Sequence, residues 1–183
     1  MIGWIVLGVI VLIGLWAVAI FNKLVKNRNL VMEGWSGIDV QLKRRYDLIP
    51  NLVQTVKGYA GHEKETLEKV VELRNSAAQA QTPSEKAPIE NMLTQTLRQL
   101  FALAEAYPDL KANQNFLDLQ EQLSEIEEQI QFSRRYYNGT ARDMNILVQS
   151  FPSNLIASSF GFKEADYFEI EVATERETPK VEF

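Results

Sequence analysis

The first 22 positions carry no charged side chain, and from Ile2 to Phe21 only glycine and tryptophan interrupt the aliphatic residues. A helix rises about 1.5 Å per residue, so this run covers about 30 Å, the thickness of the hydrocarbon core of a bilayer. The pattern predicts a transmembrane helix over residues 1–22. A cleaved signal peptide is the alternative, because Ala17 and Ala19 resemble a cleavage site, but no basic segment precedes the apolar run.

Residues 23–150 show a helical period throughout, interrupted at Gly58 to Gly61, at Gln81 to Pro88 and at Tyr107-Pro108. Three interruptions predict four helices, and we expect an all-α protein with an antiparallel four-helix bundle over residues 23–150. Two long apolar seams, spaced in threes and fours, support this expectation. The first comprises Trp35, Ile38, Leu42, Arg45, Ile49, Leu52, Val56 and Tyr59; the last comprises Phe116, Leu119, Leu123, Ile126, Ile130, Ser133, Tyr137, Thr140, Met144, Leu147 and Phe151.

Two positions leave the path of the first long helix open. Pro50 lacks the N–H that would bond to the carbonyl of Tyr46, and we expect a kink there because the apolar seam continues in phase. At Gly58 to Gly61 the chain either reverses or continues as one rod to Ala80, and a slip in the apolar register favours a reversal or a bend. Pro83 and Pro88 predict a loop, with Thr82 or Ser84 available as a helix cap.

Residues 151–183 differ in character from the bundle sequence. Ser153 to Phe162 predicts one or two helical turns, and Tyr167 to Ala173 alternates apolar and acidic residues as a strand does. Most of the negative charge lies after Lys163. We therefore expect a separate tail with an irregular or strand-like conformation.

The distribution of charge bears on location and on partners. Lys23, Lys26 and Arg28 follow the apolar run and no basic residue precedes it, so the positive-inside rule predicts an outside N-terminus and a cytoplasmic bundle. The alternative is a periplasmic or extracellular domain. The formal net charge is −5, which argues against general nucleic-acid binding.

The sequence offers little catalytic chemistry. It contains no cysteine and a single histidine, His62, and Thr66 stands where a zinc protease motif would place its second histidine. Without a further histidine, a serine has no base to activate it. We predict no catalytic residues, cofactor or metal, and a hydrolase with paired carboxylates is the enzyme alternative.

Charged residues on the seams are the remaining candidates. Arg44, Arg45, Tyr46 and Asp47 form one cluster, and the segment from Arg134 to Asp143 forms another. They predict either an anion-binding surface or interhelical ion pairs, and ion pairs are the commoner arrangement. Arg45 with Asp143 or Glu127 would make a partly buried pair that fixes helix register.

Several of these segments together resemble a known family. They are Gln41 to Val53 (QLKRRYDLIPNLV), Gly58-Tyr59, Arg134 to Asn138 (RRYYN), Asn145, Phe151 to Leu155 (FPSNL) and Phe160 to Phe162 (FGF). In these blocks the chain is similar to the LemA family of bacterial membrane proteins. The resemblance implies one N-terminal transmembrane helix, a four-helix bundle and no established enzymatic activity. One family member organises magnetosome membranes, so the resemblance implies membrane shaping as a theme.

We therefore predict a membrane-anchored scaffold that contacts the lipid bilayer and self-associates as a homo-oligomer. The alternative is an adaptor for a protein partner at the membrane, such as a protease or a signalling protein. Low, saturable binding to one partner would favour the adaptor, and large homomeric particles would favour the scaffold. The residues predicted to serve structure or interaction are Arg44, Arg45, Tyr46, Asp47, Pro50, Asn51, Arg134, Arg135, Asn138, Asp143, Asn145, Phe151, Pro152, Phe160, Phe162, Phe168 and Ile170.

Overall fold

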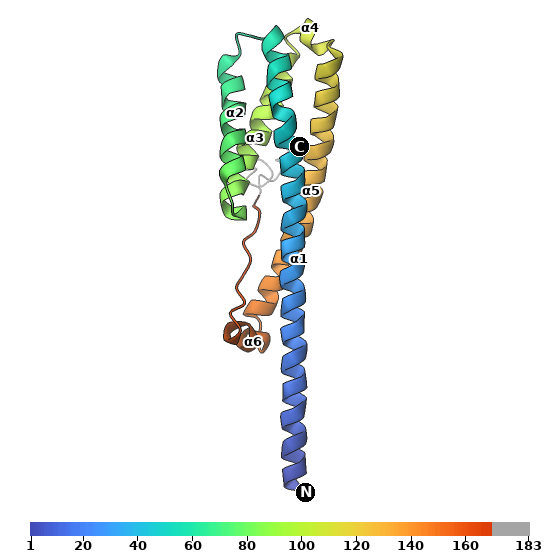
Figure 1. The fold of residues 1–183 in the computed structure, drawn as a ribbon, viewed down its shortest axis with the longest axis vertical. Coiled ribbons are helices and arrows are strands. Elements are labelled where there is room, and N and C mark those ends of the chain that lie inside the picture. Colours follow the sequence, from blue (N-terminus) through green and yellow to red (C-terminus); the bar gives the residue numbers. More distant parts are fainter. Residues whose placement is uncertain (170–183) are drawn as a thin grey trace, which may run out of the picture. The chain divides into compact units, whose positions relative to one another are not determined.

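The computed structural model describes residues 1–169, and within them the chain forms six helices and no strand. They are α1 (Ile2–Tyr59), α2 (Lys64–Gln79), α3 (Pro83–Ala104), α4 (Pro108–Lys111), α5 (Gln114–Gln149) and α6 (Ser153–Ser159) (Figure 1). The prediction of an all-α fold with a helical bundle is confirmed.

The helices belong to two compact units, and α1 and α5 each contribute to both. The hairpin unit comprises Met1–Ile38 and Ser133–Tyr167, and the bundle unit comprises Asp39–Phe132 together with Phe168 and Glu169. In the bundle unit α1, α2, α3 and α5 run side by side with alternating chain direction (Figure 1). Each unit is described separately below.

The long first helix is continuous from Ile2 through Pro50 to Tyr59. Pro50 lies on an exposed face, where its ring does not disturb the core. The carbonyl of Tyr46, deprived of the Pro50 N–H, accepts a hydrogen bond from Arg74 Nε of α2 at 3.3 Å. A side chain of the neighbouring helix therefore satisfies the backbone group that proline leaves unpaired.

The chain reverses at Gly58 to Gly61, since α1 ends at Tyr59 and α2 begins at Lys64. Two side-chain hydrogen bonds hold this end of the bundle unit. Tyr107 Oη donates to Glu63 Oε1 at 3.0 Å, and Asn113 Nδ2 donates to Tyr59 Oη at 2.9 Å. The expectation of a reversal or bend, rather than one rod to Ala80, is thus confirmed as a reversal.

The predicted loop from Gln81 to Pro88 is too long, because α3 already begins at Pro83. Thr82 caps it: its hydroxyl accepts from the Glu85 N–H at 3.3 Å, while the Glu85 carboxylate accepts from the Thr82 N–H. Hydrogen bonds from the backbone N–H groups of Gln81 and Thr82 to the Glu85 carboxylate hold the pKa of Glu85 below its usual value. Pro88 lies inside α3, and its fixed φ is compatible with the helix.

The two apolar seams form the cores as predicted, with a few exceptions. In the bundle unit the buried apolar side chains include Leu42, Ile49, Leu52, Val56, Val70, Leu93, Leu97, Leu100, Leu110, Phe116, Leu123, Ile126 and Ile130. Tyr59 and Phe151 were assigned to the seams, but they are exposed. Phe151 does not continue the seam because α5 ends at Gln149. The chain then passes through a cis Phe151-Pro152 peptide bond into α6.

The apolar N-terminal part of α1 has a different environment from the rest of that helix. Among the described helices, α1 is the one long and apolar enough to cross a membrane, and none of its most apolar window is buried against protein. Ile2, Ile5, Ile10, Leu12 and Leu15 are all more than half exposed. Such a surface requires an apolar solvent.

Candidate functional site

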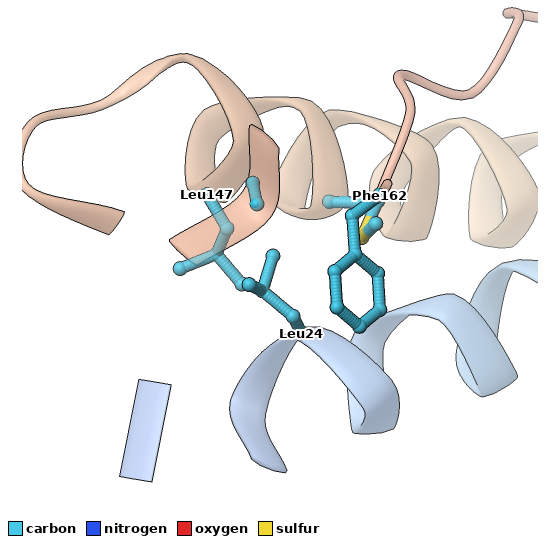
Figure 2. Close-up of a cluster of buried hydrophobic side chains, with 5 residues drawn as sticks. Leu24, Leu147 and Phe162 are labelled. Carbon is cyan, nitrogen blue, oxygen red and sulfur yellow. The ribbon is translucent and has the colours of Figure 1, made fainter. Parts of the chain in front are cut away.

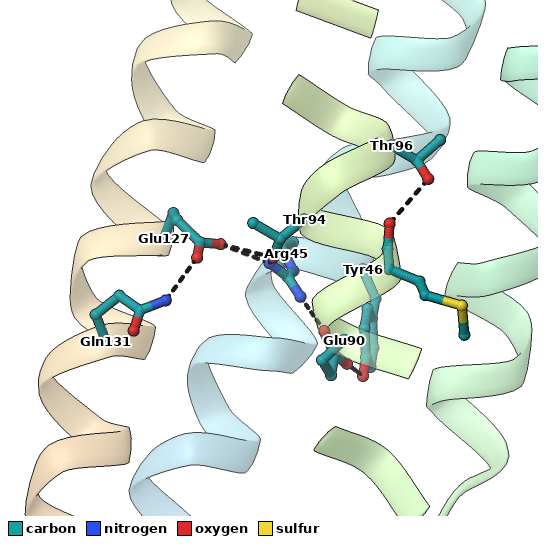
Figure 3. Close-up of polar contacts among 8 residues, drawn as sticks. Arg45, Tyr46, Glu90, Thr94, Thr96, Glu127 and Gln131 are labelled. Atoms are coloured by element: carbon teal, nitrogen blue, oxygen red, sulfur yellow. Dashed lines mark hydrogen bonds and ion pairs between the residues drawn. The ribbon is translucent and has the colours of Figure 1, made fainter. Parts of the chain in front are cut away.

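A buried polar network in the bundle unit centres on Arg45 (Figure 3). Its guanidinium forms an ion pair with Glu90 of α3, and both side chains are almost completely buried. It also pairs with Glu127 of α5 at 2.7 Å and donates to Thr94 Oγ1 at 2.8 Å. One cation thus joins three helices.

Tyr46 and Gln131 complete the network around the two carboxylates. The Tyr46 hydroxyl donates to Glu90 Oε1, and Gln131 Nε2 donates to Glu127 Oε1 at 2.9 Å. Burial, together with the adjacent Glu90 carboxylate, raises the pKa of Tyr46 far above its usual range. A second ion pair also joins α3 to α1: Lys86 Nζ lies 2.8 Å from Asp39 Oδ1. Both residues are within six positions of the network residues Glu90 and Arg45 in sequence.

This network agrees with the ion-pair interpretation of Arg45 and identifies its partners. Of the two predicted partners, Glu127 pairs with Arg45, whereas Asp143 is exposed and pairs with Arg142 at 3.0 Å. The sequence analysis missed Glu90. The sequence nevertheless indicated its position. The buried Leu100, Leu97 and Leu93 are spaced by three and four residues, and a further step of three leads from Leu93 to Glu90. The network joins α1, α3 and α5.

The hairpin unit holds a second group of the candidate residues, where the chain after α6 returns along α5. We call residues 160–167 the strap. Asn145 bonds both backbone groups of Ala165: Oδ1 accepts from its N–H at 2.7 Å and Nδ2 donates to its carbonyl at 3.0 Å. Tyr137 Oη donates to the Asp166 carbonyl at 2.7 Å.

The start of the strap is held by aromatic packing. Gly161 has a φ of +70°, a conformation that favours glycine, and it turns the chain so that Phe162 becomes buried. The centroid of the Phe162 ring lies 5.7 Å from that of the Phe21 ring, and the Arg28 guanidinium lies 5.4 Å from the Phe162 centroid. Figure 2 shows Phe162 beside Leu24 and Leu147 in the core of this unit. The Phe160-Gly161-Phe162 motif therefore closes the hairpin unit on itself.

The other candidate residues have varied positions. Arg44, Asp47, Pro50, Asn51 and Arg135 are exposed, and so are Phe151 and Phe160; Asn138 and Pro152 are partly buried, and Arg134 is buried in the hairpin unit. Phe168 is fully buried in the bundle unit. Ile170 lies outside the described residues, as does most of the strand-like segment; Tyr167 to Glu169 form no strand. Phe162 and Phe168 are thus packed within their own chain.

The comparison with known proteins agrees with these motifs. The model of the LemA family matches residues 34–183. The chain belongs to the LemA family. This LemA-family chain is similar to Protein LemA of Metamycoplasma hominis, with 26% identity over 81% of the chain and 68% of that protein. It is also similar to magnetosome protein MamQ 2 of Paramagnetospirillum magneticum, with 25% identity over 73% of the chain and 59% of that protein.

A further relative is magnetosome protein MamQ of Magnetospirillum gryphiswaldense, with 22% identity over 73% of the chain and 58% of that protein. The LemA-family chain therefore spans less than two thirds of the length of the magnetosome relatives. The family, the apolar helix α1 and these relatives together describe a membrane-anchored protein.

Because Tyr137 holds the strap through its hydroxyl proton, we expect the stability of the protein to fall at alkaline pH. Burial, and then the nearby Asp166 carboxylate, raise the pKa of Tyr137 from 10.0 to about 12. The folded protein holds this proton more tightly than the unfolded chain, so the free energy of unfolding is unaffected below pH 10 and falls as the pH rises towards 12. Tyr46 adds to this fall in the same direction.

Denaturant unfolding of the full-length protein in mild detergent at a series of pH values measures this effect. Tyr137→Phe should lower stability near neutral pH by about 1 kcal/mol, the value of one hydrogen bond, and should weaken the alkaline decline. Tyr136→Phe is the matched control, because Tyr136 is its exposed neighbour. An equal alkaline decline in Tyr137→Phe and the parent would contradict the prediction.

Proposed function

We propose that this LemA-family protein is a membrane-anchored scaffold that self-associates at the bilayer and has no catalytic activity. The observation that carries the proposal is the continuity of α1. This helix runs without a break from an apolar segment that is not packed against protein to residues of the bundle core. A continuous helix leaves no flexible linker between the apolar segment and the bundle sequence. Relatives named as magnetosome proteins support the same proposal.

The contacts made by the candidate residues also fit a scaffold. Arg45, Glu90 and Glu127 are engaged with one another in the bundle unit, and Asn145 and Tyr137 are engaged with the strap. These side chains hold helices and chain segments in register. We infer that their role is to keep a defined shape, and that surfaces outside these contacts meet other molecules.

Self-association predicts that two differently tagged full-length copies, expressed together, purify as one complex in mild detergent. Mass measurement of the purified particles should give several chains per particle, and this number should persist on dilution. An unrelated single-pass membrane protein carrying the same tags is the control. Particles of one chain in detergent and in nanodiscs would reject the scaffold. Recovery of one copy with a second protein at fixed stoichiometry would favour the adaptor alternative.

The orientation is a second proposal: the bundle faces the cytoplasm, because Lys23, Lys26 and Arg28 follow the span and no basic residue precedes it. The absence of native cysteine allows a direct test. In intact cells, a membrane-impermeant maleimide should label a cysteine added ahead of Met1, and should label Ser124→Cys only after permeabilisation. The reverse labelling pattern would establish the opposite topology.

A further inference from the structure

A second charge-free segment covers the end of α5 and the residues after it. From Met144 to Phe162 the chain contains no Asp, Glu, Lys or Arg, although 23% of the whole sequence is charged. Asp143 precedes this segment and Lys163 follows it. The segment includes the end of α5, the whole of α6 and the start of the strap. It resembles the first 22 residues in lacking charge, and the structure brings the two segments together.

Their contact lies where the membrane-spanning part of α1 ends. Leu24 packs with Leu147 and Phe162 (Figure 2). Ala157 belongs to the same cluster, and Ile20, Phe21 and Ile156 lie against it. The Phe160 ring lies 4.9 Å from the Phe21 ring. Phe21 is the last residue of the apolar run, so the start of the strap and α6 pack beside the end of that run.

The outer side of α6 is apolar and exposed. Ser153 and Ala157 are buried, and Leu155, midway between them in sequence, is 55% exposed. Because successive helical residues are about 100° apart, Leu155 lies roughly opposite the buried face. Phe151 and Phe160, at the two ends of α6, are 79% and 63% exposed. Three large apolar side chains are thus uncovered beside the end of the span.

We propose that α6, with Phe151, Leu155 and Phe160, rests in the interfacial layer of the same bilayer that α1 crosses. The surface is continuous with the membrane-spanning surface through the Phe21–Phe160 contact, and aromatic side chains favour this layer. Lys23, Lys26 and Lys163 are exposed beside the two charge-free segments, where they can meet lipid phosphates. This second contact would fix the tilt and rotation of α1. It depends on membrane anchoring and is independent of self-association.

Depth-dependent fluorescence quenching tests this placement on the full-length protein. Since the chain has no cysteine, Phe151→Cys and Leu155→Cys each give one labelling site for an environment-sensitive fluorophore. Ser124→Cys, an exposed position of α5 in the bundle unit, is the control. Each labelled protein is placed in nanodiscs that hold one copy, with nitroxide lipids labelled either near the headgroup or near the chain end. Circular dichroism verifies that the variants are folded.

At Phe151→Cys and Leu155→Cys we expect the headgroup-proximal nitroxide to quench several-fold more than at Ser124→Cys, and more than the chain-end nitroxide at the same site. Quenching no greater than at Ser124→Cys at both sites would overturn the proposal. A blue shift that appears only with several copies per disc, without lipid quenching, would assign the surface to a second copy and overturn it too. Stronger quenching from the chain end would place α6 in the hydrocarbon core instead.

Discussion

Arg45→Met should lower the free energy of unfolding of the bundle unit by about 3–5 kcal/mol, the usual effect of removing one partner of a buried ion pair. Glu90 is completely buried and would keep only the Tyr46 hydroxyl among the network contacts described above. Methionine preserves the volume of the arginine stem, so lost packing contributes little. Denaturant unfolding of the full-length protein in mild detergent, followed by far-ultraviolet circular dichroism, measures the loss.

Arg44→Met is the matched control for this experiment. Arg44 is adjacent and exposed, and its guanidinium bonds only to the partly buried Gln41 at 3.1 Å among the described contacts. Its replacement should change stability by less than about 0.5 kcal/mol. The double variant Arg45→Met with Glu90→Leu should be more stable than Arg45→Met alone, because the completely buried Glu90 carboxylate is removed together with its cation. A single variant as stable as the Arg44 control would contradict the assignment.

The position of Arg45 could be predicted from sequence, but its full set of partners could not. The apolar seam placed the guanidinium inside the bundle, where a charge requires an opposite charge. Glu127 was one residue from the buried Ile126 of the last seam, so it was a natural candidate. Glu90 was not among the candidates. The choice between Asp143 and Glu127 depended on how α1 and α5 align, which local periodicity does not fix.

The helical elements were predictable for a similar reason, and the strap was not. Helix positions follow from the three-and-four spacing of apolar residues, which each helix carries in its own sequence. The strap is extended chain held by side chains of α5, above all by Asn145 and Tyr137. The sequence analysis predicted one or two helical turns up to Phe162 and a strand-like pattern only from Tyr167, so the path of residues 163–166 was not predicted. That path depends on where the Asn145 amide lies, and its position is a tertiary feature.

Close contact between α1 and α5 in the hairpin unit depends on Gly34. A Cβ atom added at Gly34 would lie 3.1 Å from Tyr137 Cα and 3.3 Å from Tyr136 Cδ1. The first of these neighbours is backbone, so a larger side chain can be accommodated only if the helices separate. Trp35 packs on the Tyr137 ring at 5.7 Å, and Tyr137 in turn holds the strap. Separation at Gly34 should therefore loosen the strap as well.

We expect Gly34→Leu to destabilise the hairpin unit by about 3 kcal/mol, the upper part of the range for overpacking. Gly37→Ala is the control, since a Cβ at Gly37 meets nothing within 4 Å and alanine should instead stabilise the helix by up to about 1 kcal/mol. Hydrogen exchange read by mass spectrometry should show faster exchange for residues 137–149 and 160–167 in Gly34→Leu, with residues 64–79 unchanged. Exchange in Gly34→Leu that matches Gly37→Ala would mean that α1 and α5 tolerate a wider separation. In that case the strap would be held by its own hydrogen bonds to Asn145, independently of how closely the two helices approach.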